Sequence, residues 1–206
     1  MQKLLHGVDA LSTWIGKAFA WLIIALMVMV VVEVFKRYIL NMPTAWVFDV
    51  SNMMYGTLFM MCGAYALAQD GHVRGDFLYG SMKPRLQAGL DLVLFVAFFL
   101  PGIVALTWAG WRYFGDSWRM HETTFNATPL PISPFKFIIP LAGLTVLIQG
   151  ISEMIRCVEC LRTGEWTPRL ADAQEADVVA QQLEGSEAVD AEARELAIEK
   201  SKGLKG

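Results

Sequence analysis

A stretch without any charged side chain, from Val50 to Gln69, limits most strongly what this chain can fold into. As an α-helix, a segment of this length extends about 30 Å, which is the thickness of the hydrocarbon core of a bilayer. Trp46 precedes the stretch and Asp70 follows it, so groups that favour the membrane boundary or water lie at both ends. We therefore expect a membrane-spanning helix over about residues 46–69.

Three further apolar blocks have the length of a membrane helix, at about residues 14–40, 86–111 and 135–156. Hydrophobic residues make up 55% of the chain and charged residues 18%, against about 25% charged residues in an average soluble domain. Pro101-Gly102, in the middle of the third block, predicts a kink in that helix. The sequence thus predicts an all-α membrane protein with four transmembrane helices, in one membrane domain over residues 1–169.

The two ends of the chain differ from these blocks. A helical stripe of apolar residues near the N-terminus predicts a helix that lies on the membrane surface, formed by Leu4, Leu5, Val8, Leu11 and Ile15. Residues 170–206 hold nine acidic and four basic side chains, so we expect a soluble acidic tail that is disordered or loosely helical. Eight Lys and Arg residues lie near the termini and in the second loop, against five in the other two loops, so we expect both termini in the cytoplasm.

The predicted spans contain few polar side chains, and this limits the chemistry of the chain. An enzyme needs acids, bases or metal ligands that converge at one depth. Haem between helices needs histidines inside the spans, whereas His6, His72 and His121 lie outside the predicted ones. Cys157 and Cys160 have the spacing of a metal or redox pair, but without a histidine or second pair nearby we interpret them as apolar residues of a helix end. We expect a scaffold or accessory protein without enzymatic activity, metal or cofactor.

Several short polar patterns flank the predicted spans in a defined order. They are Glu33-x-x-x-Arg37-Tyr38, Pro43-Thr44-x-Trp46-x-x-Asp49, Gly71-His72-Val73-Arg74-x-Asp76, Ser117-Trp118, Glu122-Thr123, Pro131-x-x-Pro134-x-Lys136, and Pro140-Leu141 to Gln149-Gly150. In their order and spacing, the chain resembles the small membrane subunit of a tripartite ATP-independent periplasmic (TRAP) transporter over roughly Leu11 to Arg162. It is most similar to the branch described for mannitol or chloroaromatic compounds.

This resemblance implies a division of labour among three proteins in the bacterial inner membrane and periplasm. A periplasmic binding protein captures an organic anion, and a large membrane subunit carries the substrate and Na⁺ in a sodium-driven symport. The small subunit packs against the static part of the large subunit and gives its moving domain a fixed wall. The implied partners are therefore these two proteins and membrane lipids, without nucleic acid, and the implied Na⁺ sites lie in the large subunit.

Three groups of residues are candidate contact sites under this interpretation. For anchoring the outer end to a partner or to lipid, the candidates are Glu33, Arg37, Trp46 and Asp49. For fixing the inner loop in the same way, they are His72, Arg74 and Asp76. For docking the binding protein, they are Arg119, Glu122 and Lys136. The alternative function is a four-span assembly or channel-like subunit of another membrane complex.

Overall fold

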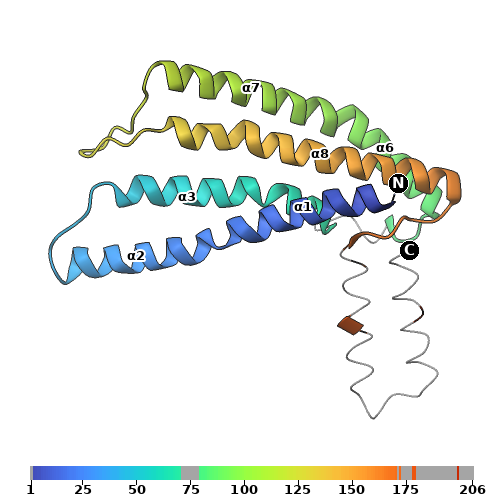
Figure 1. The fold of residues 1–206 in the computed structure, drawn as a ribbon, viewed down its shortest axis with the longest axis horizontal. Coiled ribbons are helices and arrows are strands. Elements are labelled where there is room, and N and C mark those ends of the chain that lie inside the picture. The colour runs from blue at the N-terminus through green and yellow to red at the C-terminus, as the bar shows by residue number, and fades with distance from the viewer. Residues whose placement is uncertain (1, 71–78, 171, 173–177, 180–198, 200–206) are drawn as a thin grey trace, which may run out of the picture.

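The computed structural model describes residues 2–70, 79–170, 172, 178–179 and 199 of the chain. In this part, four helical runs lie side by side in an elongated bundle (Figure 1). The described residues form no strand, and one isolated β-bridge joins Thr123 to Pro131. The predicted all-α class is confirmed. Nearly all of the predicted acidic tail, residues 170–206, lies outside the described residues.

The first run consists of α1 (Gln2–Ala20) and α2 (Leu22–Tyr38), with only Trp21 between them. Leu4 and Leu11, from the apolar stripe that predicts a surface helix, are exposed on α1. The neighbouring, largely polar face is buried in the bundle, and Leu5 from the stripe lies on it together with Asp9, Ser12, Thr13 and Gly16. Because the outside of a membrane bundle meets lipid, apolar side chains face outward and polar side chains face their partners inside. The N-terminal helix is therefore a packed part of the bundle, in contrast to the predicted surface helix.

The second run consists of α3 (Val47–Met61) and α4 (Gly63–Ala68), joined at Cys62. Backbone hydrogen bonds continue across this junction, from the Cys62 N–H to the Leu58 carbonyl (3.1 Å) and from the Ala66 N–H to the Cys62 carbonyl (2.9 Å). The run covers the predicted span at residues 46–69, but as two shorter helices. Among the described residues, the helices long and apolar enough to cross a membrane are three: Gln2–Tyr38, Pro84–Arg119 and Ser133–Thr163. A fourth crossing stays a prediction.

The third run consists of α6 (Pro84–Leu94), the π-helix η1 (Phe95–Phe99) and α7 (Leu100–Arg119). The sequence predicts a kink at Pro101-Gly102, and the irregular segment lies directly before it. Proline has no N–H for the helix ladder, and its ring clashes with the carbonyl of residue i−4. The wider turn of a π-helix over Phe95–Phe99 relieves that clash while the helix runs on.

Helix α8 (Ser133–Thr163) lies at the centre of the bundle and contacts α1, α3, α4, α6 and α7. Its close contacts depend on glycine, because a Cβ atom on Gly150 would lie 2.1 Å from Phe99 Cε1. The helix ends at Gly164, whose left-handed φ of 90° closes its last turn. It runs past the predicted end near residue 156, so that Glu153 and Arg156 lie inside the bundle.

The bundle has two polar ends. We call the end that carries the connections 39–46 and 120–132 the hairpin end, and the opposite end, which carries Gln2 and the last turns of α8, the terminal end (Figure 1). After α8, residues 164–170 fold back over the terminal end, and we call this segment the strap. His6 Nε2 lies 3.1 Å from the Pro168 carbonyl oxygen, so the strap contacts α1 directly.

Candidate functional site

A buried ion network occupies the terminal end. Arg156 on α8 is 0% exposed, and its guanidinium donates hydrogen bonds to Asp9 Oδ2 on α1 (2.6 Å) and to Glu153 Oε1 on α8 (2.5 Å). Asp9 and Glu153 are also buried, at 1% and 3% exposed. Charges at this depth are stable only when they are paired and hydrogen-bonded. The network therefore ties α1 to α8.

Two neutral polar side chains extend the network toward the middle of the bundle. Gln149 on α8 donates from Nε2 to Asp9 Oδ1 (2.9 Å), and its Oε1 accepts from the Ser12 hydroxyl on α1 (2.8 Å). Gln149 and Ser12 are both buried. Both the nitrogen and the oxygen of the Gln149 side-chain amide thus have partners on α1, which fixes the register between α1 and α8.

The strap closes the network from outside the helices. Arg169 donates to Glu153 Oε2 (2.9 Å) and pairs with Asp70 Oδ2 (3.0 Å), and the Leu170 N–H donates to Asp9 Oδ2 (3.2 Å). Burial opposes the charged form of Arg169, but the nearby Glu153 and Asp70 carboxylates outweigh it and hold the Arg169 pKa above its usual value. Both oxygens of Asp9 and both of Glu153 thereby have hydrogen-bond donors.

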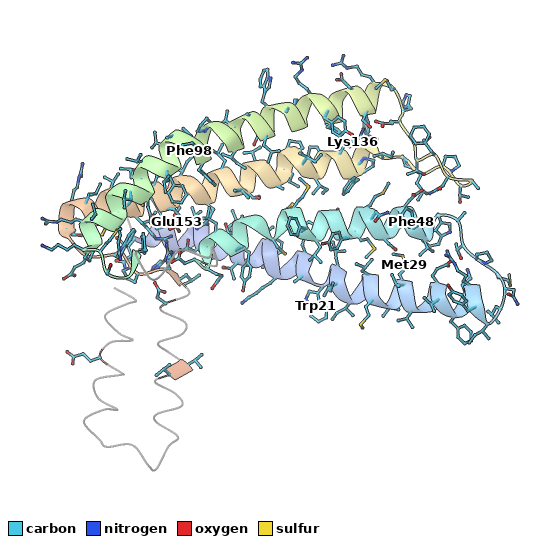
Figure 2. The ribbon with its side chains drawn as sticks, turned by 180° about the vertical axis from the view of Figure 1, so that it is seen from behind. Trp21, Met29, Phe48, Phe98, Lys136 and Glu153 are labelled. Carbon is cyan, nitrogen blue, oxygen red and sulfur yellow. The ribbon has the colours of Figure 1, made fainter. Side chains whose placement is uncertain are left out.

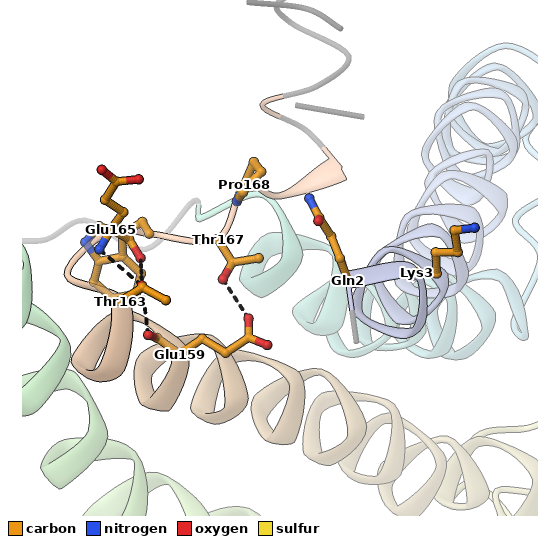
Figure 3. Close-up of a pocket in the computed structure, with 8 residues that line it drawn as sticks. Gln2, Lys3, Glu159, Thr163, Glu165, Thr167 and Pro168 are labelled. Atoms are coloured by element: carbon orange, nitrogen blue, oxygen red, sulfur yellow. Dashed lines mark hydrogen bonds between the residues drawn. The ribbon is translucent and has the colours of Figure 1, made fainter. Parts of the chain in front are cut away.

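A pocket of about 650 Å³ opens beside the strap, between its residues, the last turns of α8 and the start of α1 (Figure 3). Thr167 Oγ1 donates to Glu159 Oε2 (2.7 Å), and Thr163 Oγ1 donates to the Glu159 carbonyl (2.9 Å). Lys3 lines the α1 side of the pocket. Thr163 Oγ1 also donates to the Glu165 carbonyl of the strap (3.1 Å). The bonds of Thr167 to Glu159 and of Thr163 to Glu165 hold the strap to α8, and the pocket is the space beside it.

At the hairpin end, a second polar group joins α2 to the connection that follows it. Glu33 Oε1 accepts from Arg37 Nη2 (2.9 Å), from Arg37 Nε (3.3 Å) and from the Thr44 N–H (3.0 Å). Lys36 Nζ donates to Thr44 Oγ1 (2.6 Å). Glu33 and Arg37, which are spaced i,i+4, therefore form an ion pair, and Glu33 also holds the 39–46 connection against α2.

Trp46 and Asp49, the other two candidates for anchoring the outer end, lie at the start of α3. Trp46 precedes the first residue of α3 and is 40% exposed. Asp49 lies in the first turn, where the helix dipole favours a negative charge, and its Oδ1 accepts from Asn126 Nδ2 (2.6 Å). Asp49 therefore connects α3 to the 120–132 connection. Its Oδ2 is buried without a hydrogen-bond partner among the described residues.

The candidates for docking the binding protein divide into a pair and a separate cation. Lys136 on α8 donates to Glu122 Oε2 and lies over the Tyr113 ring, 3.8 Å from its centroid. The hydrogen bond from Lys136 holds the pKa of the Glu122 carboxyl below its usual value of 4.5. Arg119, by contrast, is exposed at the C-terminal end of α7 and does not join this pair. The Glu122–Lys136 pair thus closes the 120–132 connection, beside the Thr123–Pro131 bridge.

The inner-loop candidates His72, Arg74 and Asp76 lie outside the described residues. The sequence analysis missed the buried network, because Gln149 and Arg156 on α8 are 140 and 147 residues away from Asp9 on α1. One feature of the sequence indicates the α1 side of the network: Asp9, Ser12 and Gly16 share a face of α1 that lies beside its apolar stripe. In a membrane bundle such a face is the buried one.

The fold and these two ends define the class: an α-helical membrane protein whose buried charges are paired across helices. In the parts that the structure describes, no three His, Cys, Asp or Glu residues are grouped to hold a metal ion. Residues 26–160 match the family model described as "Tripartite ATP-independent periplasmic transporters, DctQ component", and the chain belongs to this family of transporter components. Such components work with a large membrane subunit and a periplasmic binding protein. A search of curated proteins gave no match.

Proposed function

We propose that this chain is the scaffold subunit of a sodium-driven TRAP transporter for organic acids, of the mannitol or chloroaromatic branch. It lies in the bacterial inner membrane with both termini in the cytoplasm and crosses the membrane four times. The large subunit holds the substrate and Na⁺, and this chain forms a fixed wall beside it. The family match supports the subunit assignment.

The single observation that carries the scaffold role is the network around Arg156. A wall beside a moving domain must keep its own shape, and its helices must therefore be fixed to one another. Arg156, Asp9 and Glu153 are buried and bonded between α1 and α8, and the strap adds a second cation through Arg169. Removing one partner of such a buried pair leaves a charge without compensation, so the network requires α1, α8 and the strap to keep their mutual positions.

The hairpin end supplies the proposed anchors to the large subunit or to lipid. Glu33, Arg37 and Asp49 are charged groups at a membrane boundary, and Trp46 has the amphipathic ring typical of that depth. The double variant Arg37→Ala and Asp49→Ala should lower the amount of large subunit that copurifies with this chain. A matched control, Arg162→Ala with Glu165→Ala, removes an exposed pair of opposite charges at the terminal end. Equal copurification from both double variants would refute the anchoring role.

Two further contacts are proposed. Arg119, Glu122 and Lys136 face the periplasm and help dock the binding protein, whereas His72, Arg74 and Asp76 fix the inner loop against lipid or the large subunit. The double variant Arg119→Ala and Glu122→Ala should weaken binding of the periplasmic protein to the assembled complex. Unchanged docking and unchanged uptake in that variant would refute the docking role.

The experiment for the function as a whole is uptake by proteoliposomes that contain this chain and its large subunit, with the binding protein outside. We expect organic-acid uptake that needs an inward Na⁺ gradient and stops when this chain is omitted. Uptake that proceeds equally without this chain would contradict the proposal. A stable assembly of this chain with an unrelated complex would favour the alternative of a four-span assembly or channel-like subunit.

A further inference from the structure

A pocket of about 340 Å³ lies between α2 and α3 near the hairpin end. Phe48 on α3 lines it, and Figure 2 labels this residue near the start of α3, next to α2. The rest of its wall is formed by apolar side chains, two uncharged polar ones and two charged ones: Val30, Val34, Val47, Tyr38, Ser51, Asn52, Glu33 and Arg37. The pocket therefore combines apolar surface with a charged part, Glu33 and Arg37, which we call its head.

In the part of the chain that the structure describes, only one of the two Glu33 carboxylate oxygens has hydrogen-bond donors. Its Oε1 accepts three hydrogen bonds, from Arg37 and from the Thr44 N–H, whereas its Oε2 is buried and has no partner among the described residues. Glu33 as a whole is 7% exposed. A buried acceptor without a donor is costly, and native structures rarely leave one. Because Glu33 lines the pocket, a donor group of a ligand bound there would supply the missing hydrogen bond.

Arg37 offers the opposite charge beside it. Its side chain is 49% exposed, and only Nε and Nη2 of its guanidinium are bonded to Glu33. A guanidinium has five N–H donors, so Arg37 can bind an anionic oxygen while it remains paired with Glu33. Acceptor and donor are one helical turn apart on α2. The head of the pocket therefore suits a group that carries a cation and an anion close together.

We propose that this pocket binds a phospholipid with a primary ammonium head group. The ammonium donates to Glu33 Oε2, the phosphate accepts from Arg37, and an acyl chain runs along Val30 and Val34. Both valines are more than two-fifths exposed, so this wall opens on the outside of the bundle where lipid lies. A lysine or arginine from a partner protein fits less well, because it places a second cation beside Arg37 without an anion to bind that residue.

Native mass spectrometry of the full chain in detergent tests the proposal with three lipids of the same acyl chains. They carry ethanolamine, choline or glycerol head groups. Choline has no N–H donor and glycerol has no cation, so we expect the ethanolamine lipid to be retained about tenfold more strongly. Equal retention of the ethanolamine and choline lipids would overturn the proposal.

Two variants distinguish the contribution of the Glu33 carboxylate to lipid binding from that of the apolar space in the pocket. Glu33→Gln keeps an oxygen for Arg37 and Thr44 but places an N–H₂ group where the ammonium would bind, and it should abolish the preference for ethanolamine. Val34→Trp fills the space along Val30 and Val34 where the acyl chain would lie, and it leaves Glu33 and Arg37 in place. It should weaken retention of the ethanolamine lipid about tenfold. Glu165→Gln, an exposed glutamate at the terminal end, is the matched control and should retain the preference.

An unchanged preference for ethanolamine in Glu33→Gln would overturn the proposal. Unchanged retention of the ethanolamine lipid in Val34→Trp would also overturn it, which keeps the proposal falsifiable if the first variant does not fold. No ethanolamine preference in the native chain, together with loss of the large subunit from Glu33→Gln, would assign the pocket to a protein side chain instead. The lipid measurement uses this chain alone. A failure of the lipid measurement would therefore leave the proposed transporter function untouched. Likewise, a failure of the uptake experiment would leave the lipid proposal untouched.

Discussion

The two ends of the bundle differ in how many oxygens of their buried carboxylates have hydrogen-bond donors. At the terminal end, both oxygens of Asp9 and both of Glu153 have hydrogen-bond donors, which come from α1, α8 and the strap. At the hairpin end, Glu33 and Asp49 each keep one buried oxygen without a partner among the described residues. A third carboxylate at the hairpin end, Glu122, is paired with the buried Lys136 and is itself partly exposed.

This difference indicates different tasks for the two ends. At the terminal end every carboxylate oxygen of Asp9 and Glu153 has its donor, although Arg156 Nε and Arg169 Nε are buried without a partner among the described residues. These carboxylates therefore need no donor from another protein. A buried carboxylate oxygen that lacks a donor is stabilised when a ligand or partner supplies one. We therefore interpret the terminal end as the brace of the bundle and the hairpin end as its contact surface.

The largest effect is expected from breaking the brace. Arg156→Met leaves Asp9 and Glu153 buried without their shared cation, and it should lower the free energy of unfolding by about 3–5 kcal/mol. Thermal unfolding of the purified chain in detergent measures this loss. Arg162→Met, an exposed arginine two turns further along α8, should leave the unfolding temperature nearly unchanged. Equal stability of the two variants would show that the network does not brace the bundle.

A smaller effect is expected from opening the strap. Arg169→Gln removes the cation from Glu153 Oε2 and from Asp70, but Arg156 still binds the other oxygen of Glu153. The loss should be about 1.5–3 kcal/mol, the range for a hydrogen bond to a charged group. Hydrogen exchange should then quicken in α1 and stay unchanged in α3, with Arg162→Gln as the control. Exchange that quickens in α3 and not in α1 would contradict the assignment of the strap.

At the hairpin end, loss of charge should change the stability of the isolated chain little. Glu33→Gln keeps an oxygen for Arg37 and Thr44, and an ion pair with a half-exposed arginine contributes at most about 1 kcal/mol. Its unfolding temperature in detergent, without added phospholipid, should lie close to that of the native chain and well above that of Arg156→Met. If Glu33→Gln destabilised the chain as much as Arg156→Met, the two ends would not differ in the way described.

The smallest effect concerns acid and the 120–132 connection. The pKa of Glu122 is lower in the folded chain than its usual value of 4.5, because Lys136 donates to the carboxylate. The pair therefore contributes stability above about pH 4.5, and this contribution is lost as the pH falls through the lowered pKa. Glu122→Gln should flatten this part of the pH dependence of the unfolding temperature, whereas Glu165→Gln should not. An unchanged slope in Glu122→Gln would show that another carboxyl carries it.

The sequence predicts the helical runs well, because a long charge-free block has few other stable forms in a membrane. The Glu33–Arg37 pair was also within reach, since its i,i+4 spacing is local. The Arg156 network was not, because Asp9, Asp70 and Arg169 come from different segments and no short spacing relates them. The surface-helix prediction for α1 weighed its apolar stripe alone, and the polar face decided how that helix packs.

The most direct test of the account is to purify the full chain through a C-terminal tag in mild detergent, from cells that also express its neighbouring genes. Mass spectrometry then identifies the proteins that copurify with it. We predict recovery of a large membrane subunit in an amount close to that of this chain. Recovery of the chain alone, or with an unrelated membrane complex, would contradict its assignment as a scaffold subunit of a TRAP transporter.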